Sequence, residues 1–333
     1  MTNEQPLYIY KSNNLITMTD LTTIALDASL TMPDRLKSYK NIMVSVSGGS
    51  DSDVLVDLVT KSIEDKTKVH FVFFDTGVEY EATKRHLVEL EEKYGITIER
   101  IKADKPIPFV CRNYGQPFMS KFVSEMMMRL QRHNFDWSDK SYEELIEQFP
   151  KCQIALKWWC NANGENSRFN INRNKYLKEF ILENPPTFKV SNKCCYFAKK
   201  TLSAKYEKQH GIDMRITGVR KAEGGIRASA YKSCFTDKGD GKADYRPMWW
   251  FTDADKQNYT EVCGVTHSDC YTKYGLKRTG CAGCPLGRDF TKELEAIREF
   301  EPKLYAAVLK IFGDSHDYTL KYREFVKRKK ESE

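Results

Sequence analysis

The sequence predicts an α/β fold with a doubly wound, mainly parallel sheet, and three observations support this prediction. An apolar strand at 42–46 runs into a glycine-rich turn and then an amphipathic helix. A second apolar strand at 69–74, a charged helix at 81–94 and a strand at 96–101 repeat the alternation. A fourth strand, at 214–219, leads into a loop rich in glycine and arginine. Strands that alternate with helices usually pair in parallel, so we expect ligands at their carboxyl ends.

The turn after the first strand reads Ser47-Gly48-Gly49-Ser50-Asp51-Ser52 and precedes a helix. Unpaired backbone N–H groups and the positive end of a helix dipole bind anions at such a position, and Gly48 and Gly49 allow a close approach. A plain Ser/Gly turn is the alternative interpretation. The chain has no Walker sequence G-x-x-x-x-G-K-[ST], which disfavours an ordinary P-loop kinase or GTPase.

This turn resembles the S-G-G-x-D-S signature of the PP-loop ATP pyrophosphatases, an adenine nucleotide alpha-hydrolase-like superfamily that includes the phosphoadenosine phosphosulfate (PAPS) reductases. The resemblance implies that Ser47 to Ser52 hold the phosphates of an adenine nucleotide. In the ATP-using members, the reaction is cleavage between the α and β phosphates, which adenylates a substrate and releases pyrophosphate. Mg²⁺ bridges phosphate oxygens in such a reaction, and Asp51 is then a catalytic candidate.

Two further strand ends carry segments similar to those of the same family. Asp75-Thr76-Gly77 resembles a D-T-G segment near the nucleotide, which places Phe74 or Asp75 near the adenosine; a turn that caps the next helix is the alternative. Gly218-Val219-Arg220 resembles the G-[IL]-R segment of the reductases, and Arg227 is the second arginine of that segment. Arginine flanked by glycine suits phosphate or sulfate, whereas a surface ion pair is the alternative. Gly224 stands where the family often has serine.

The ten cysteines include two groups, Cys194-Cys195 and Cys281-Ala282-Gly283-Cys284. Four thiolates suit an iron–sulfur cluster, while zinc and buried free thiols are the alternatives. The pattern is similar to the [4Fe-4S] site of adenylyl-sulfate reductases. Lys199 stands four residues after Cys195, as does the basic residue beside the cluster in that family. The resemblance therefore implies that these four cysteines ligate a [4Fe-4S] cluster and that Lys199 tunes it.

The other cysteines show no comparable pattern, and we expect them to be core or incidental residues. They are Cys111, Cys152, Cys160, Cys234, Cys263 and Cys270.

Composition favours an intracellular enzyme. The chain has 333 residues, of which 41% are hydrophobic, enough for a sizeable core. No apolar run approaches the roughly 20 residues that span a bilayer, and the N-terminus lacks a secretory signal. We expect a cytoplasmic protein without membrane contact. The formal net charge of +7 suits nucleotide or nucleic-acid partners, although a solvated basic tail explains part of it.

We expect three regions along the chain. Residues 1–39 form an N-terminal extension without a motif. Residues 40–235 form the PP-loop nucleotide-binding domain, with a mostly helical insertion at about 113–193. Residues 236–333 form a cluster-binding and helical C-terminal region, whose last helices we expect to pack on the sheet domain.

Two features separate this chain from a thiol-dependent sulfonucleotide reductase. Such reductases carry a nucleophilic cysteine in a C-terminal tail, but no cysteine follows Cys284. Their phosphate loop also departs from S-G-G-x-D-S. An intact loop together with a cluster is more similar to the iron–sulfur ATP pyrophosphatases of sulfur incorporation, such as the reductase-like component of DNA phosphorothioation systems.

Three functional hypotheses follow. The first is an adenylating ATP pyrophosphatase that uses ATP, Mg²⁺ and a [4Fe-4S] cluster. Its partners are a nucleic-acid substrate, a sulfur donor such as a cysteine desulfurase, and a second copy in a homodimer. The second is a reductase of adenylyl sulfate or its 3′-phosphorylated form, with Cys234, Cys270 or a partner's thiol as nucleophile. The third is a non-catalytic nucleotide sensor in a larger complex.

Overall fold

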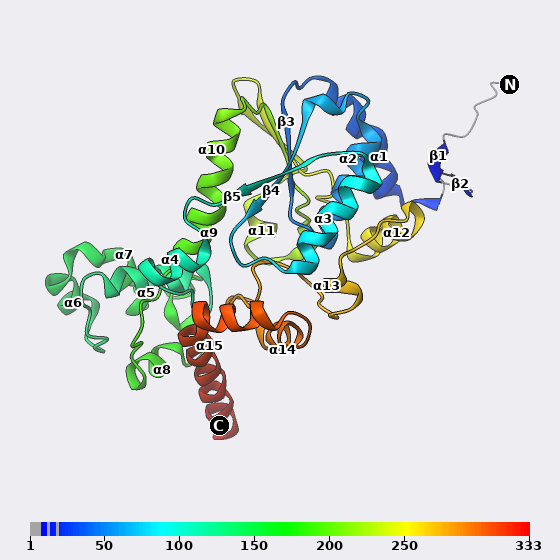
Figure 1. Cartoon of the computed structure of the whole chain (residues 1–333). Coiled ribbons are helices and arrows are strands. Elements are labelled where there is room, and N and C mark those ends of the chain that lie inside the picture. The colour runs from blue at the N-terminus through cyan, green and yellow to red at the C-terminus, as the bar shows by residue number, and fades with distance from the viewer. Residues whose placement is uncertain (1–7, 12–13, 18–19) are drawn as a thin grey trace. The chain divides into compact units, whose positions relative to one another are not determined.

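The structure is a computed structural model that describes residues 8–11, 14–17 and 20–333. The chain forms two compact units, each built from separated segments (Figure 1). The sheet unit comprises Met1–Asp75, Glu79–Lys102 and Leu202–Gly280, and the helical unit comprises Thr76–Val78, Ala103–Thr201 and Cys281–Glu333. The expected limits at residues 40 and 236 stay predictions, and part of the expected N-terminal extension 1–39 lies outside the described residues.

The sheet unit contains a six-stranded sheet in the order β5-β4-β3-β6-β8-β7. Its strands are β3 (Ile42–Val46), β4 (Val69–Asp75), β5 (Ile98–Lys102), β6 (Met214–Ile216), β7 (Phe235–Gly239) and β8 (Lys242–Tyr245). Neighbouring strands pair in parallel except β7 and β8, which form an antiparallel hairpin at one edge. The prediction of a mainly parallel α/β sheet is confirmed. A separate antiparallel pair, β1 (Tyr8–Lys11) and β2 (Asn14–Thr17), precedes the sheet.

Helices cover both faces of this sheet. The helices that do so are α1 (Thr23–Lys37), α2 (Ser50–Ser62), α3 (Glu81–Tyr94), α10 (Thr201–Gln209) and α12 (Asp253–Cys263). The sheet unit also contains α11 (Gly225–Ala230) and α13 (Asp269–Thr272). On β3, Val44 joins a core cluster to which α1, α2, α3 and α12 contribute apolar side chains. The neighbouring Met43 joins a second cluster with Tyr206 of α10. Successive side chains of a strand point to opposite faces, so the two clusters lie on opposite faces of the sheet.

The strand order reverses at β3. The chain runs outward from β3 to β4 and β5, and later returns on the other side of β3 as β6. Open α/β sheets bind ligands at such a switch point, outside the carboxyl ends of the strands. The turn after β3 and the loop after β6 both lie at this point.

The described part of the helical unit contains helices, connecting segments and an isolated bridge between Gln116 and Val190. Its helices are α4 (Ile107–Tyr114), α5 (Lys121–Gln131), α6 (Tyr142–Gln148), α7 (Gln153–Trp159), α8 (Leu177–Glu183), α9 (Lys193–Cys195), α14 (Phe290–Phe300) and α15 (Pro302–Glu331). Tyr318 and Phe325 of α15 pack in one core cluster with Trp158 of α7. The C-terminal helix therefore contributes to the core of the helical unit, and the expected packing of the last helices on the sheet domain stays a prediction.

None of the helices in the described residues is both long and apolar enough to cross a membrane.

Candidate functional site

The phosphate turn, residues 47–52, lies between the end of β3 and the first turn of α2. Its own serines fix its backbone, because the Ser47 N–H donates to Ser52 Oγ at 2.9 Å and the Gly49 N–H donates to Ser47 Oγ at 3.4 Å. Gly48 has a φ of 65°, and a Cβ there would lie 2.5 Å from Thr83 Cγ2. Only glycine fits this position without strain. The turn therefore presents a defined backbone at a helix N-terminus, the helix end that favours anions.

Charged side chains from distant segments meet at this turn. Arg220 Nε donates to Asp51 Oδ1 at 2.7 Å, and Arg220 Nη1 lies 2.9 Å from Asp253 Oδ1. Lys256 of α12 places its Nζ 3.0 Å from Ser50 Oγ and 3.2 Å from Asp51 Oδ1. One carboxylate thus lies between two cations at the start of α2. Such a set suits phosphate groups together with a divalent cation.

Arg220 is held tightly in this arrangement, with only 5% of its surface exposed. Burial would lower the pKa of its guanidinium, but the carboxylates of Asp51 and Asp253 outweigh burial and raise that pKa. Gly218 makes the approach feasible, because a Cβ there would lie 3.0 Å from the Asp51 carbonyl oxygen. Arg227 lies in α11, but its side chain is outside the described part of the structure.

Two hydroxyl groups that the sequence analysis missed also lie at the turn. The Ser50 N–H donates to Tyr271 Oη at 3.0 Å, and Tyr271 Oη lies 3.0 Å from Thr279 Oγ1. No local signal connects these residues with a turn so far away in the sequence. The sequence analysis also missed Lys256, although its position is unusual. Lys256 lies in the first turns of α12, where the helix dipole disfavours a cation, and a cation at such a position indicates a contact with a negative group.

Behind the turn, Asp53 of α2 is fully buried between two histidines. His86 Nε2 lies 3.1 Å from Asp53 Oδ1, and His267 Nδ1 lies 2.8 Å from Asp53 Oδ2. His86 Nδ1 lies 2.9 Å from Glu89 Oε2. Burial would lower the pKa of His86, but the neighbouring carboxylates of Asp53 and Glu89 raise it overall. This network ties α2 to α3 and supports the turn from behind.

The segment Asp75-Thr76-Gly77 is divided between the two units. Asp75 ends β4, while Thr76–Val78 belongs to the helical unit. Phe74 packs edge-on against Tyr206, with ring centroids 6.4 Å apart, on the face that α10 covers. The expected roles of Phe74, Asp75 and Gly77 at an adenosine therefore stay predictions.

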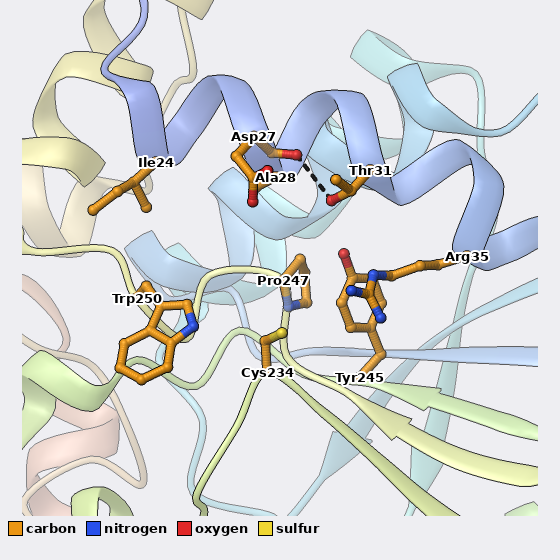
Figure 2. Close-up of a pocket in the computed structure, with 9 residues that line it drawn as sticks. All are labelled: Ile24, Asp27, Ala28, Thr31, Arg35, Cys234, Tyr245, Pro247 and Trp250. Atoms are coloured by element: carbon orange, nitrogen blue, oxygen red, sulfur yellow. Dashed lines mark hydrogen bonds between the residues drawn. The ribbon is translucent and has the colours of Figure 1, made fainter.

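A small pocket in the sheet unit contains Cys234, a candidate nucleophile of the reductase hypothesis. Figure 2 shows the pocket between α1 and a second wall formed by Cys234, Tyr245, Pro247 and Trp250. Its volume is about 40 Å³. Pockets for small-molecule ligands usually measure roughly 300 to 1,000 Å³, so this pocket is too small for a nucleotide.

The four cysteines expected to bind metal all belong to the helical unit. Cys194 and Cys195 lie in α9, and Cys281 and Cys284 lie before α14. Cys194 and Cys284 both lie within electrostatic range of Cys195, and Cys284 also lies within electrostatic range of Cys281. The fold thus gathers thiols from two distant segments into one group.

These thiols are held in an environment that disfavours thiolates. Burial raises the pKa of Cys284 to about 12, and the neighbouring Cys281 adds to this effect. The hydrogen bond with Cys194, followed by burial, raises the pKa of Cys195, while the positive charges of Lys121 and Lys199 oppose the rise. Lys199 lies in a π-helical turn, Tyr196–Lys200, directly after the cysteine pair. A bound cationic centre would stabilise the thiolates far more than one lysine does.

Within the described residues, no three His, Cys, Asp or Glu side chains have the geometry of a site for a metal ion. A four-iron cluster spreads its ligands more widely than a single ion, because each thiolate binds a different iron. Four thiols are the donor type that such a cluster uses, and the [4Fe-4S] cluster at these cysteines stays a prediction.

His316 of α15 supports the turn that carries the second cysteine pair. Its Nε2 lies 2.7 Å from the Gly283 carbonyl oxygen, and its ring stacks on Phe290 with centroids 4.9 Å apart. A Cβ at Gly283 would lie 2.5 Å from Val308 Cγ1, so glycine is required for this close packing. The C-terminal helix therefore fixes the turn between Cys281 and Cys284.

Residues 41–120 match the family model of the phosphoadenosine phosphosulfate reductase domain. The match confirms the expected resemblance to the PAPS reductases. A curated relative, an uncharacterized protein of Methanocaldococcus jannaschii, is 30% identical over 146 residues. The match covers 44% of this chain and 28% of the relative, so the chain spans under a third of that protein's length.

Solved structures with distant similarity include three enzymes. A phosphoadenylyl-sulfate reductase from Candida auris, in a phosphate complex, has a TM-score of 0.43 at 14% identity. The match covers 82% of this chain and 97% of the reductase. The U34-tRNA thiolase NcsA from Methanococcus maripaludis, with its [4Fe-4S] cluster, has a TM-score of 0.40 at 12% identity. The match covers 93% of this chain and 84% of the thiolase. The NH3-dependent NAD synthetase from Campylobacter jejuni has a TM-score of 0.37 at 11% identity and covers 90% and 94%. Similarities of this size carry no argument about chemistry.

Proposed function

We propose that this protein is a PP-loop enzyme that cleaves ATP between its α and β phosphates, in line with the match of residues 41–120 to the family model of the phosphoadenosine phosphosulfate reductase domain. The observation that carries the proposal is the convergence of Asp51, Arg220 and Lys256 on the N-terminus of α2. Backbone N–H groups and two cations suit a polyphosphate, and the carboxylate suits a divalent cation. The product is an adenylated substrate.

In this reaction, a substrate oxygen attacks the α phosphorus, the bond to the bridging oxygen of the β phosphate breaks, and pyrophosphate leaves. The backbone and serine hydroxyls of Ser47 to Ser52 hold the leaving phosphates. Arg220 and Lys256 balance the charge that develops on them, and Arg227 is a second arginine for the same task. Mg²⁺, when bound beside Asp51, neutralises further phosphate charge.

The thiol group of the helical unit is assigned to a [4Fe-4S] cluster. Cys194, Cys195, Cys281 and Cys284 would supply its four thiolates, and the charge of Lys199, which acts on Cys195, would offset part of the cluster's negative charge. The cluster would either join the two cysteine-bearing segments or deliver sulfur. Sulfur incorporation into an adenylated acceptor needs a sulfur-donor protein, and a nucleic acid is the proposed acceptor.

The reductase hypothesis is less well supported by the thiols of the sheet unit. Reduction of a sulfonucleotide needs a thiolate that can reach sulfur. Cys270 is fully buried, and its Sγ lies 3.8 Å from Thr83 Oγ1. Cys234 lies in the pocket of about 40 Å³, which cannot admit a nucleotide. Cys270 is therefore closed off in the conformation described, whereas Cys234 is partly exposed.

The decisive experiment measures pyrophosphate released from Mg-ATP in the presence of nucleic-acid acceptors. Asp51→Ala is expected to lower the release at least about 100-fold, since it removes the carboxylate at the turn. Asp34→Ala is the matched control, because Asp34 is an exposed carboxylate of α1 that pairs with Lys37. Wild-type protein that binds ATP but releases no pyrophosphate with any acceptor would instead support the nucleotide sensor.

A further inference from the structure

Tyr271 of α13 occupies a backbone donor of the phosphate turn. The Ser50 N–H donates to Tyr271 Oη at 3.0 Å, and Ser50 is the first residue of α2. The N–H groups at the start of a helix have no acceptor within that helix, and they are the groups that bind phosphate oxygens. The tyrosine hydroxyl therefore lies at a donor that the proposed function assigns to a phosphate oxygen.

Three other N–H groups of the turn bond to atoms of the turn itself. The N–H groups of Ser47 and Gly49 donate to the serine hydroxyls of the turn, and the Ser52 N–H donates to the Gly49 carbonyl oxygen at 2.7 Å. A ligand that took these donors would have to rearrange the turn. The Ser50 N–H, by contrast, is bonded to a side chain from another segment. A phosphate oxygen can take it once the Tyr271 hydroxyl leaves, with the turn unchanged.

The Tyr271 hydroxyl lies directly on the turn and still has room to leave it. A Cβ on Gly49 would lie 3.3 Å from Tyr271 Oη and 3.1 Å from Thr279 Oγ1, and these two hydroxyl oxygens are 3.0 Å apart. The Tyr271 ring lies beside the His267 ring, with centroids 5.8 Å apart. The tyrosine is half-buried, so its side chain can turn toward solvent.

The same segment of the chain also contacts the loop that carries Arg220. Arg278, the residue before Thr279, places its Nη2 3.4 Å from Glu223 Oε2. Glu223 Oε1 in turn accepts the Arg220 N–H at 3.2 Å. Residues 271–279 thus contact both the phosphate turn and the loop after β6. A change at Tyr271 therefore occurs where the proposed function places the phosphates.

We propose that Tyr271 is a displaceable ligand of the phosphate turn, whose hydroxyl takes the place of a phosphate oxygen and gives up the Ser50 N–H when the nucleotide binds. This inference rests on the nucleotide site of the proposed function. Only hydrogen bonds change in the exchange: the bond from the Ser50 N–H to the hydroxyl is replaced by one to the phosphate. Because the hydroxyl competes for this donor, it weakens the binding of the nucleotide and favours the departure of pyrophosphate.

Tyr271→Phe tests the competition, because it removes the hydroxyl and keeps the ring. The free protein then loses a hydrogen bond that the complex does not contain. We expect the variant to bind the nucleotide about three- to tenfold more tightly than wild type, the effect of one neutral hydrogen bond. Titration calorimetry of the full-length protein with Mg²⁺ and α,β-methylene ATP, which cannot release pyrophosphate, measures this affinity.

Thermal unfolding gives a second measurement. We expect Tyr271→Phe to lower the melting temperature of the protein without nucleotide, and this difference to disappear with saturating α,β-methylene ATP, because tighter binding offsets the lost hydrogen bond. Tyr94→Phe is the matched control. Tyr94 Oη donates to Asp57 Oδ1 at 2.9 Å in the same unit, and not to the turn. Its loss should leave the affinity unchanged and lower the melting temperature with and without nucleotide.

The outcomes separate this inference from the proposed function. If wild type binds the analogue and Tyr271→Phe binds it equally or more weakly, the exchange is overturned and the nucleotide site stands. Weaker binding would make the hydroxyl a ligand of the nucleotide and not its competitor. Wild-type protein that does not bind the analogue would overturn the nucleotide site itself, and with it the exchange.

Discussion

Lys256 gives the phosphate turn its second positive charge. Its ammonium contacts both the hydroxyl of Ser50 and the carboxylate of Asp51, whereas Arg220 contacts Asp51 from the other side. A lysine ammonium is a compact charge on a flexible stem and can follow a phosphate as it moves. Arg220, buried and bound to two carboxylates, is restricted to one geometry. We therefore expect Lys256 to adjust to a bound phosphate and Arg220 to keep one fixed geometry at the same site.

Replacement of Lys256 by methionine keeps the length of the side chain and removes its charge. We expect Lys256→Met to weaken ATP binding by about tenfold, the loss of one charge-assisted hydrogen bond. Titration calorimetry with ATP measures this, and Lys256→Arg should recover part of the affinity. Lys37→Met, at an exposed lysine of α1, is the control. Equal affinity of Lys256→Met and wild type would show that Lys256 does not contact the nucleotide.

Some contacts of individual residues could be predicted from the sequence and others could not. The positions of Gly48 and Arg220 at the ends of strands were predictable, because a glycine-rich turn and a Gly-x-Arg loop both follow apolar strands. Tyr271 was not, because its contact with the Ser50 N–H joins residues that only the folded chain brings together.

At the scale of the element, the strands β3 and β4 begin where the sequence predicts. β5 begins at Ile98 and not at residue 96, because Gly95 ends α3 in the left-handed conformation and the Ile96 N–H still bonds to Glu91. The sequence analysis did not predict the hairpin β7–β8. Its strands are short and largely polar, and Gly239, Asp240 and Gly241 all have positive φ at the tight turn.

The link between α2 and α3 makes a prediction about pH. Both ring nitrogens of His86 face carboxylate oxygens, so the protonated ring fits best and its pKa is raised. This stabilisation is complete below the unfolded pKa of about 6.5 and is lost as the pH rises through the higher folded value. We expect His86→Gln to cost about 2 kcal/mol of unfolding free energy at pH 6 and less at pH 9.

Urea unfolding at the two pH values measures this difference. His133→Gln, at an exposed histidine, should show no change with pH and serves as the control. A cost of His86→Gln that is equal at pH 6 and pH 9 would mean that His86 contributes by packing and not by charge.

At the scale of the whole molecule, both units are built from separated segments of the chain. The five tryptophans divide between them. Trp137, Trp158 and Trp159 lie in the helical unit, while Trp249 and Trp250 lie in the sheet unit. This division allows the two units to be followed separately when single tryptophans are replaced. The general division into a sheet part and a helical part was predictable, but the limits of the units were not, because contacts and not sequence order define them.

Removal of the proposed cluster should affect the helical unit. Its thiols come from α9 and from the turn before α14, so the cluster would cross-link two segments. We expect chelation of iron without oxygen to lower the melting temperature of the helical unit by about 5 to 10 °C. Fluorescence of a variant that keeps Trp158 measures this, and a variant that keeps Trp249 reports on the sheet unit. An unchanged melting temperature for Trp158 would contradict a structural contribution of the cluster.

The interleaved segments also determine the order of events during synthesis. A ribosome makes β3 to β5 first, then most of the helical unit, and only later β6, which completes the centre of the sheet. Until β6 emerges, one edge of β3 has no partner strand, so the nascent chain exposes an edge that can pair wrongly. Cys281 and Cys284 emerge after the whole sheet unit. If they bind the cluster as proposed, iron insertion must follow translation of nearly the entire chain, and a ribosome-bound chain that stops before Cys281 should carry no cluster.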